Sequence, residues 1–144
     1  MDEYLIKFVE WAKLKIRIHL LDNSAISFKN REIWWASMGI NVGSEQNGKN
    51  AKFERPVLVL RKFGQHIFWT VPLTTKEKDN PYHHKFNYKV YFEDENGNLN
   101  KETKKGIVIL NQFKTMSSKR LLRKMGVVPI EEFVQIRKKL KRLL

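Results

Sequence analysis

The chain has 144 residues, 42% of them hydrophobic, which fits a single folded domain with a core of its own. Its 28 Lys and Arg residues outnumber 15 Asp and Glu residues, and the formal net charge of +13 favours a polyanion such as nucleic acid as ligand. The absence of cysteine excludes disulfide bonds and thiolate metal sites, and no apolar run is long enough to span a bilayer. We therefore expect a cytoplasmic protein without a membrane partner.

The first predicted element is an amphipathic helix over residues 4–20. The apolar face that we expect to pack on the domain consists of Leu5, Phe8, Val9, Ala12 and Ile16. The alternation of basic and apolar residues over 13–20 also fits a strand. We interpret residues 1–24 as an N-terminal helical extension and residues 25–144 as the main domain. A weaker interpretation makes the helix a membrane-surface or partner-docking element.

Short apolar stretches separated by polar turns predict a mainly antiparallel sheet in the centre of the chain. The predicted strands cover residues 32–38, 56–62, 66–73, 84–92 and 106–110. A polar loop is expected at 41–52, and a long loop at the tip of a hairpin at 93–105. Two helices are predicted after the sheet, one at 119–125 capped by Ser117–Ser118 and one after Pro129 whose stripe is Phe133, Ile136, Leu140 and Leu144. The fold class is therefore α+β, with a small antiparallel barrel or strongly bent sheet.

One arginine and one threonine stand at the ends of two neighbouring predicted strands. Arg55 precedes the strand at 56–62, and the next strand ends at Thr74 and Thr75. Antiparallel pairing would bring the guanidinium and a hydroxyl to one edge of the sheet. A guanidinium binds phosphate oxygens through two parallel hydrogen bonds, so the pair suits a phosphate. Taken alone, these residues also fit a solvated arginine and a turn-forming threonine.

Several segments together resemble the MazF/PemK toxins of bacterial toxin–antitoxin modules. The segments are EIWW at 32–35, GSEQNG at 43–48, RPVLVL at 55–60, PLTT at 72–75 and LNQFKT at 110–115. They occur in the family's order, and the resemblance covers roughly residues 31–144.

The resemblance implies an SH3-like barrel that works as a homodimer and as the toxin of a type II toxin–antitoxin system. It implies an endoribonuclease without metal or cofactor, which inhibits growth by cutting single-stranded RNA, typically mRNA. In this family the RNA 2′-hydroxyl attacks the phosphate, leaving a 2′,3′-cyclic phosphate and a 5′-hydroxyl. An acidic protein antitoxin normally covers the RNA site. The alternative is a catalytically silent nucleic-acid-binding module on the same barrel.

The resemblance assigns catalysis to Arg55 and Thr74, with Thr75 as the fallback. It assigns RNA binding to Glu45, Lys78 and Lys114, and we predict that Gln112 also binds RNA through a base, with support of the loop as its alternative role. For Glu45 three roles stay open: accepting a proton, reading a base edge, or holding Arg55 by charge. Some relatives have a histidine before the catalytic arginine, where this chain has Glu54, so the general base also stays open.

The remaining polar and aromatic residues suggest no second kind of site. The four histidines, His19, His66, His83 and His84, lack the spacing of a zinc site, so we predict no metal site. Most aromatic residues on the predicted strands are expected to pack in the core. Tyr82 and Tyr88 are expected to be exposed and able to stack on unpaired bases.

Overall fold

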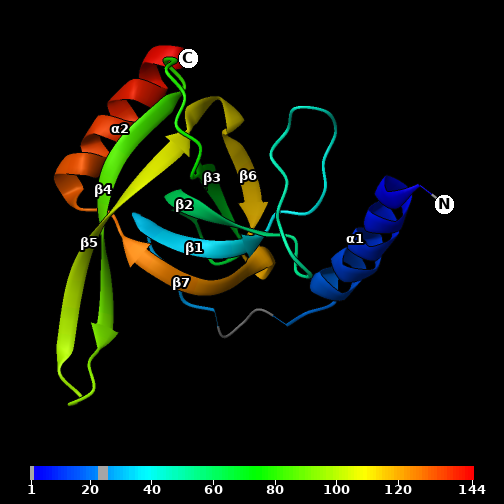
Figure 1. The fold of residues 1–144 in the computed structure, drawn as a ribbon, viewed down its shortest axis with the longest axis horizontal. Helices are drawn as coiled ribbons and strands as arrows, with labels where there is room; N and C mark the ends of the chain where they lie inside the picture. Colours follow the sequence, from blue (N-terminus) through cyan, green and yellow to red (C-terminus); the bar gives the residue numbers. More distant parts are fainter. Residues whose placement is uncertain (1, 23–25) are drawn as a thin grey trace.

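The computed structural model describes residues 2–22 and 26–144 and has an α+β fold around a closed sheet (Figure 1). The predicted boundary between residues 24 and 25 lies outside the described residues. Within them, no helix is long and apolar enough to cross a membrane. The elements in chain order are α1 Glu3–His19, β1 Glu32–Ser37, β2 Glu54–Phe63, β3 Ile67–Thr74, β4 His83–Glu93, β5 Leu99–Ile109, a 3-10 turn at Leu110–Gln112, β6 Lys114–Ser117, a 3-10 turn at Ser118–Arg120, β7 Leu121–Val127 and α2 Ile130–Leu143.

Six strands form a ring in the order β2-β1-β7-β4-β5-β3, and pairing of β3 with β2 closes it. All of these pairings are antiparallel. On its other edge β3 is shared by two strands, because β5 pairs with its last two residues and β6 with its first four. Closure leaves the strands with few free edges, which stabilises a small sheet. The predicted fold class, an α+β fold with a small antiparallel barrel, is confirmed.

Strand β2 is buried on both of its faces, which explains its continuous apolar sequence. Leu58 and Leu60 belong to one core cluster with Ile33 and Phe86. Val57 and Val59, which point to the other face of the strand, belong to a second cluster. Helix α2 covers the first cluster through Phe133 and Ile136, with Leu140 packed beside them. The last residue of the predicted stripe, Leu144, is 95% exposed beyond the end of α2.

The helix predicted at 119–125 is wrong, because this segment is strand β7. Only the turn at Ser118–Arg120 is helical, and the Ser117 hydroxyl caps it by accepting from the Lys119 N–H. Pairing with β1 buries Leu121. It also places Arg123 beside Glu54 and Lys124 beside Glu32. These tertiary contacts outweigh the weak helical preference of the segment.

The loop predicted at 93–105 is also shorter than expected. Strand β5 begins at Leu99, so β4 and β5 form a long hairpin whose tip is closed by Asp94, which accepts from the N–H groups of Asn96 and Asn98. The charged residues at 101–105 therefore belong to strand β5, where they pair with residues of β4. At the base of the hairpin Tyr88 is 4% exposed, so its expected exposure is wrong, while Tyr82 is exposed as expected.

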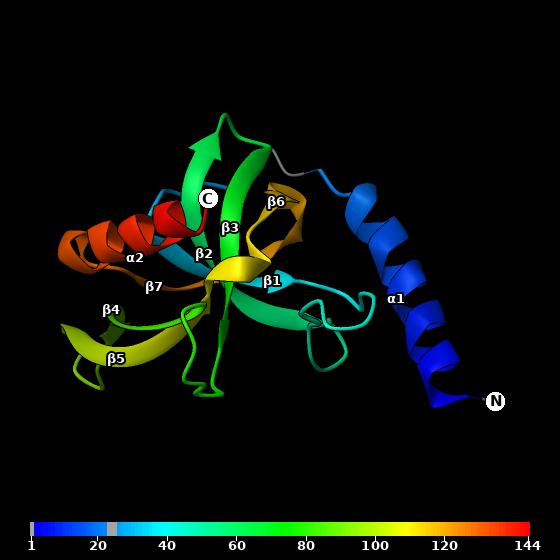
Figure 2. The same cartoon turned by 90° about the horizontal axis from the view of Figure 1, so that it is seen from above.

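Helix α1 lies at the opposite side of the barrel from α2 (Figures 1 and 2). It docks through Trp11, which is 7% exposed and whose ring centroid is 5.6 Å from that of Phe53. The Arg120 guanidinium lies 5.6 Å from the centre of the Trp11 ring, and Lys119 Nζ donates to the His19 carbonyl at 2.7 Å. The predicted packing face is wrong: it is exposed, because the flat Trp11 ring on another face fits against Gly39.

The contact between Trp11 and Gly39 gives a test of this docking. A Cβ atom at Gly39 would overlap the Trp11 indole, and its φ of +83° adds backbone strain. We therefore expect Gly39→Ala to undock α1 and make it sensitive to proteolysis. Gly64→Ala is the matched control, since Gly64 also has positive φ but nothing lies within 4 Å of its added Cβ. Gly64→Ala should lower the free energy of unfolding by roughly 1–2 kcal/mol and leave α1 protected from proteolysis. Equal protection of α1 in both variants would contradict the docking.

Candidate active site

The β2–β3 pair brings the two predicted catalytic residues together. The register matches Val57 with Pro72, and two further residues along it place Arg55 opposite Thr74. The Arg55 Nη1 atom donates to the Leu73 carbonyl oxygen at 3.0 Å, which fixes the guanidinium at the end of β3. The guanidinium therefore lies at the end of β3, at the carbonyl group one residue before Thr74.

Main-chain carbonyl groups, rather than a carboxylate, hold Arg55. Its Nε atom donates to the Asn47 carbonyl at 2.6 Å, in addition to the bond with Leu73. In the part of the chain that the structure describes, no carboxylate pairs with it, so its positive charge stays available to an anion. Two of its five N–H donors are used, and the rest suit phosphate oxygens. Burial lowers the pKa of Arg55, which makes the guanidinium a stronger acid than a free arginine.

The loop between β1 and β2 folds over this point through its own side chains. Asn41 donates to the Gln46 carbonyl at 2.7 Å, and its N–H donates to Asn47 Oδ1 at 2.7 Å. Gln112 bridges to the same loop: its Oε1 accepts from the Gln46 N–H at 3.4 Å, and its Nε2 donates to the Ser44 carbonyl at 3.3 Å. The loop therefore has a defined shape before any ligand arrives, and Asn47 links that shape to Arg55.

Three of the four predicted RNA-binding residues, Glu45, Gln112 and Lys114, line one polar cavity of about 360 Å³. Its other lining residues are Met38, Asn41, Gln46, Pro72, Asn111 and Phe113. The cavity lies beside Arg55, because Pro72 precedes the carbonyl group that holds its guanidinium. Lys78, the fourth predicted residue, is exposed after β3 and does not line this cavity.

Lys114 lies in a strongly basic environment. Burial lowers its pKa most, the positive charges of Arg120 and Lys15 lower it further, and the carboxylate of Glu45 opposes them. A cluster of cations with one nearby carboxylate favours binding of an anion, which would relieve their mutual repulsion. Arg120 and Lys15 were not predicted from the sequence, because nothing in the local pattern separates them from the other basic residues.

The structure narrows the roles of the acidic residues. Glu45 Oε1 accepts from the Val42 N–H at 3.0 Å, and no ion pair joins it to Arg55 among the described residues. The expected role of holding Arg55 by charge is therefore not supported. Glu54 is buried and forms two hydrogen bonds with Arg123, at 2.9 and 3.1 Å. A carboxylate occupied in this way is a structural residue.

The hydroxyl of Thr74 accepts from the Lys76 N–H at 3.2 Å, so its own hydrogen is free to donate to a ligand.

In the described part of the chain, neither His84 nor a metal cluster adds to the candidate site. The strand alternation puts His84 on the face of the sheet opposite to that of Thr74, in register with Val108 and Leu73. Across residues 2–22 and 26–144, no cluster of three or more His, Cys, Asp or Glu side chains is placed to hold a metal ion.

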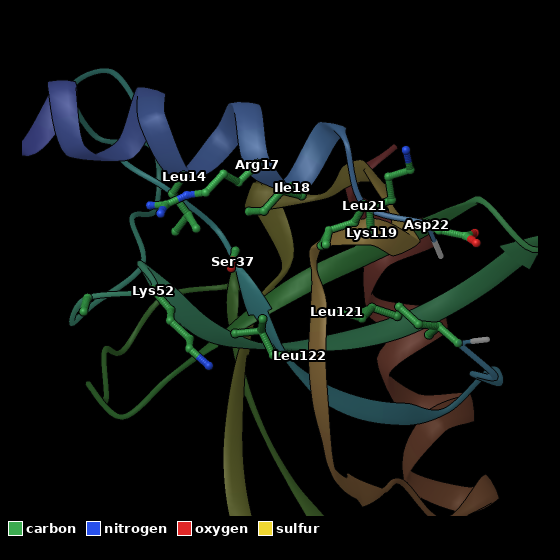
Figure 3. Close-up of a pocket in the computed structure, with 12 residues that line it drawn as sticks. Leu14, Arg17, Ile18, Leu21, Asp22, Ser37, Lys52, Lys119, Leu121 and Leu122 are labelled. Carbon is green, nitrogen blue, oxygen red and sulfur yellow. The ribbon is translucent and has the colours of Figure 1, made fainter. Parts of the chain in front are cut away.

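A second, mostly apolar cavity of about 460 Å³ lies between α1 and the barrel. Leu14, Arg17 and Ile18 point from α1 toward the barrel, facing Leu121 and Leu122 of β7 (Figure 3). None of the residues predicted for catalysis or RNA binding lines it. Its apolar walls mark the docked face of α1.

A family model described as the PemK-like, MazF-like toxin of type II toxin–antitoxin systems matches residues 29–144. The fold is similar to the crystal structure of MazF from Deinococcus radiodurans, with a TM-score of 0.56, 20% identity, and coverage of 82% of this chain and 96% of that chain. It is also similar to an endoribonuclease in complex with its cognate antitoxin from a mycobacterial species, with a TM-score of 0.54, 13% identity, and coverage of 81% and 93%. No curated protein matches this chain.

The Glu54–Arg123 pair predicts how stability depends on pH. The Arg123 hydrogen bonds lower the pKa of Glu54 most, so the stabilisation is complete above the usual carboxyl pKa and is lost as pH falls through the lower folded value. We expect Glu54→Gln to lower the free energy of unfolding at pH 7 by about 1–3 kcal/mol. The difference from the wild type should shrink near pH 3. Glu131→Gln, in the exposed first turn of α2, is the control, and denaturant melts at both pH values make the comparison.

Proposed function

This chain belongs to the PemK-like, MazF-like toxin family of type II toxin–antitoxin systems, and from that premise we propose that it is a metal-independent endoribonuclease that cuts single-stranded RNA, typically mRNA. The observation that supports this proposal is the hydrogen bond of the Arg55 guanidinium to the Leu73 carbonyl, one residue before Thr74 and beside a polar cavity. A module that only binds RNA does not require a guanidinium fixed next to a free hydroxyl hydrogen. We also propose residues 25–144 as the toxin domain and residues 1–24 as an N-terminal helical extension that this chain adds to it.

The proposed reaction is an internal transesterification. The RNA 2′-oxygen loses its proton and bonds to the adjacent phosphorus, the bond from phosphorus to the 5′-oxygen breaks, and that oxygen takes up a proton. Arg55 donates to the phosphate oxygens and stabilises the negative charge that develops on them. Thr74 donates its hydroxyl hydrogen to the same phosphate. The products are a 2′,3′-cyclic phosphate and a 5′-hydroxyl.

Two proton transfers need residues within reach of the phosphate. Glu45 is the only carboxylate among the residues that line the cavity, so we propose it as the group that accepts the 2′-hydroxyl proton. Arg55, whose pKa burial lowers, is our candidate for supplying a proton to the 5′-oxygen. Gln112 and Lys114 then serve to bind the neighbouring nucleotides, Gln112 through hydrogen bonds and Lys114 through phosphate contacts. Lys78 would act only on RNA that extends beyond the cavity.

We also propose an acidic protein antitoxin and a homodimer as the assembly states. The net charge of +13 favours an acidic partner, both in steering it and in complementing the surface. The mycobacterial endoribonuclease with a similar fold was solved with its cognate antitoxin. For the dimer, the support is membership of the family.

The direct test is to incubate the purified chain with RNA of mixed sequence in EDTA and to map the ends that form. We expect cleavage to persist in EDTA and to leave 2′,3′-cyclic phosphate and 5′-hydroxyl ends. Arg55→Ala should lower the rate by about 10²–10³, since one contact to developing charge is lost. Arg55→Lys should also be slow, because lysine keeps the charge but loses the planar fork.

Matched substitutions separate chemistry from folding. Arg61→Ala removes an exposed arginine from the same strand, and Thr75→Val removes the hydroxyl next to Thr74. We expect both to cleave at the wild-type rate, whereas Thr74→Val should be slow with an unchanged circular dichroism spectrum. Full activity of a folded Arg55→Ala chain would refute the catalytic assignment. RNA binding without cleavage by the wild type would favour the silent binding module instead.

Salt dependence and hydrodynamics test the binding mode. RNA affinity of the Arg55→Ala chain should fall with salt, with a log–log slope of roughly −0.7 for each phosphate contact, and Lys114→Ala should make the slope shallower by about that amount. Sedimentation equilibrium at micromolar concentration should report a dimer. A salt-independent affinity would contradict the phosphate contacts, and a monomer at all concentrations would contradict the dimer.

A further inference from the structure

Helix α1 carries two apolar faces, and only one of them is covered. The covered face packs on the barrel through Trp11, Leu14 and Ile18. We call the second face the free face. Its large apolar side chains are each between 42% and 74% exposed. It consists of Leu5, Phe8, Val9, Ala12, Ile16 and Leu20.

The free face is continuous and points away from the barrel. At about 100° per residue, its six side chains fall within an arc of about 120°, and the centre of that arc is about 150° from the centre of the covered face. His19 is the one titratable residue of α1 inside the arc, and no Lys, Arg, Asp or Glu of the helix falls there. Lys15 borders it on one side and Lys13 on the other, so an uncharged stripe runs along the helix between basic edges.

We propose that the free face of α1 is a docking site for an amphipathic helix of an acidic protein partner. Such a helix would lay its own apolar stripe on Phe8 and Ile16 and direct its carboxylates to the basic edges. Among the described residues the edge residue Lys15 has no carboxylate partner, and the other edge residue, Lys13, has only an exposed contact with Glu10 at 4.0 Å. Identifying the partner as the antitoxin rests on the proposed function, but the chemistry of the surface does not.

Charge argues against the two other occupants of such a face. A second copy of the chain on this face would bring the basic edges of two helices, Lys13 and Lys15 in each, close together. A lipid surface is attracted by a helix whose polar side is rich in Lys and Arg. In α1 the side opposite the free face instead carries Glu3 and Glu10 as well as Lys7 and Arg17, and two of the four cations of the helix are paired with carboxylates.

Docking at α1 would hold a partner next to the candidate active site. Trp11 packs against Gly39 and Phe53, which lie at the beginning and the end of the loop that carries Glu45. A partner chain that binds α1 with one segment would therefore present its neighbouring segment to the cavity at high effective concentration. In this way α1 would strengthen inhibition without contacting RNA.

The test uses a synthetic three-heptad peptide with leucine and isoleucine at positions a and d and glutamate at e and g. Its binding to the full chain is measured by calorimetry without RNA. We expect the double variant Phe8→Ala/Ile16→Ala to bind it at least about tenfold more weakly than the wild type. Ile6→Ala is the matched control, because Ile6 is also exposed on α1 but lies outside the free face, and it should bind like the wild type. Alanine keeps the helix in all variants.

Three further results decide the proposal. A peptide with lysine in place of glutamate should bind at least about tenfold more weakly, and equal binding would overturn the proposal. It would also be overturned if the double variant bound as tightly as the wild type. Sedimentation that shows an oligomer lost in the double variant, or binding of phosphatidylcholine–phosphatidylserine vesicles lost in it, would assign the face to a second copy or to lipid. A chain that binds the peptide and does not cut RNA would refute only the proposed function.

Discussion

The pairing of β2 with β3 is the constraint on which the rest of the structure depends. It closes the ring of strands, buries both faces of β2, and places Arg55 opposite Thr74. A slip of one residue in this register would exchange the two core clusters and turn the Arg55 side chain to the other face. The requirement for a packed core therefore also fixes the geometry of the candidate site, so most substitutions that disturb the core will also disturb the site.

The loop between β1 and β2 depends on the same pair of strands. Arg55 is bound by the Asn47 carbonyl on one side and the Leu73 carbonyl on the other, so its side chain joins the loop to the barrel. Gln112 makes a second connection from the far side of the cavity. Because Arg55 shapes its surroundings and is also the proposed catalytic residue, Arg55→Ala is a poor test by itself. Arg55→Lys and the Thr74→Val substitution are needed to separate the two contributions.

The sequence predicted those parts of the fold that follow from local pattern. The apolar runs and the turn around Gly64 predict β2 and β3, and the register then follows from burial on both faces. Local pattern predicts a helix at 119–125, whereas residues 121–127 form strand β7, because pairing with β1 joins residues that are about ninety positions apart in the sequence, from the pair Ala36 and Leu121 to the pair Glu32 and Val127. For the candidate site, motif order selected Arg55, Thr74, Glu45 and Gln112, whose roles stay predictions, and the sequence did not reveal that Glu54 is bound to Arg123. That contact is purely tertiary, and no periodicity reports it.

The two faces of α1 show why a hydrophobic pattern alone did not identify the packing surface. The wider stripe through Phe8 and Ile16 is the stronger helical signal, yet it is the narrower stripe through Trp11 that is buried. The choice depends on shape, because the Trp11 ring needs a surface without a Cβ, and Gly39 supplies it. If the wider stripe only faced water, we would expect small or polar side chains on it. Its large apolar residues instead remain exposed, a cost in solubility that a partner helix would remove.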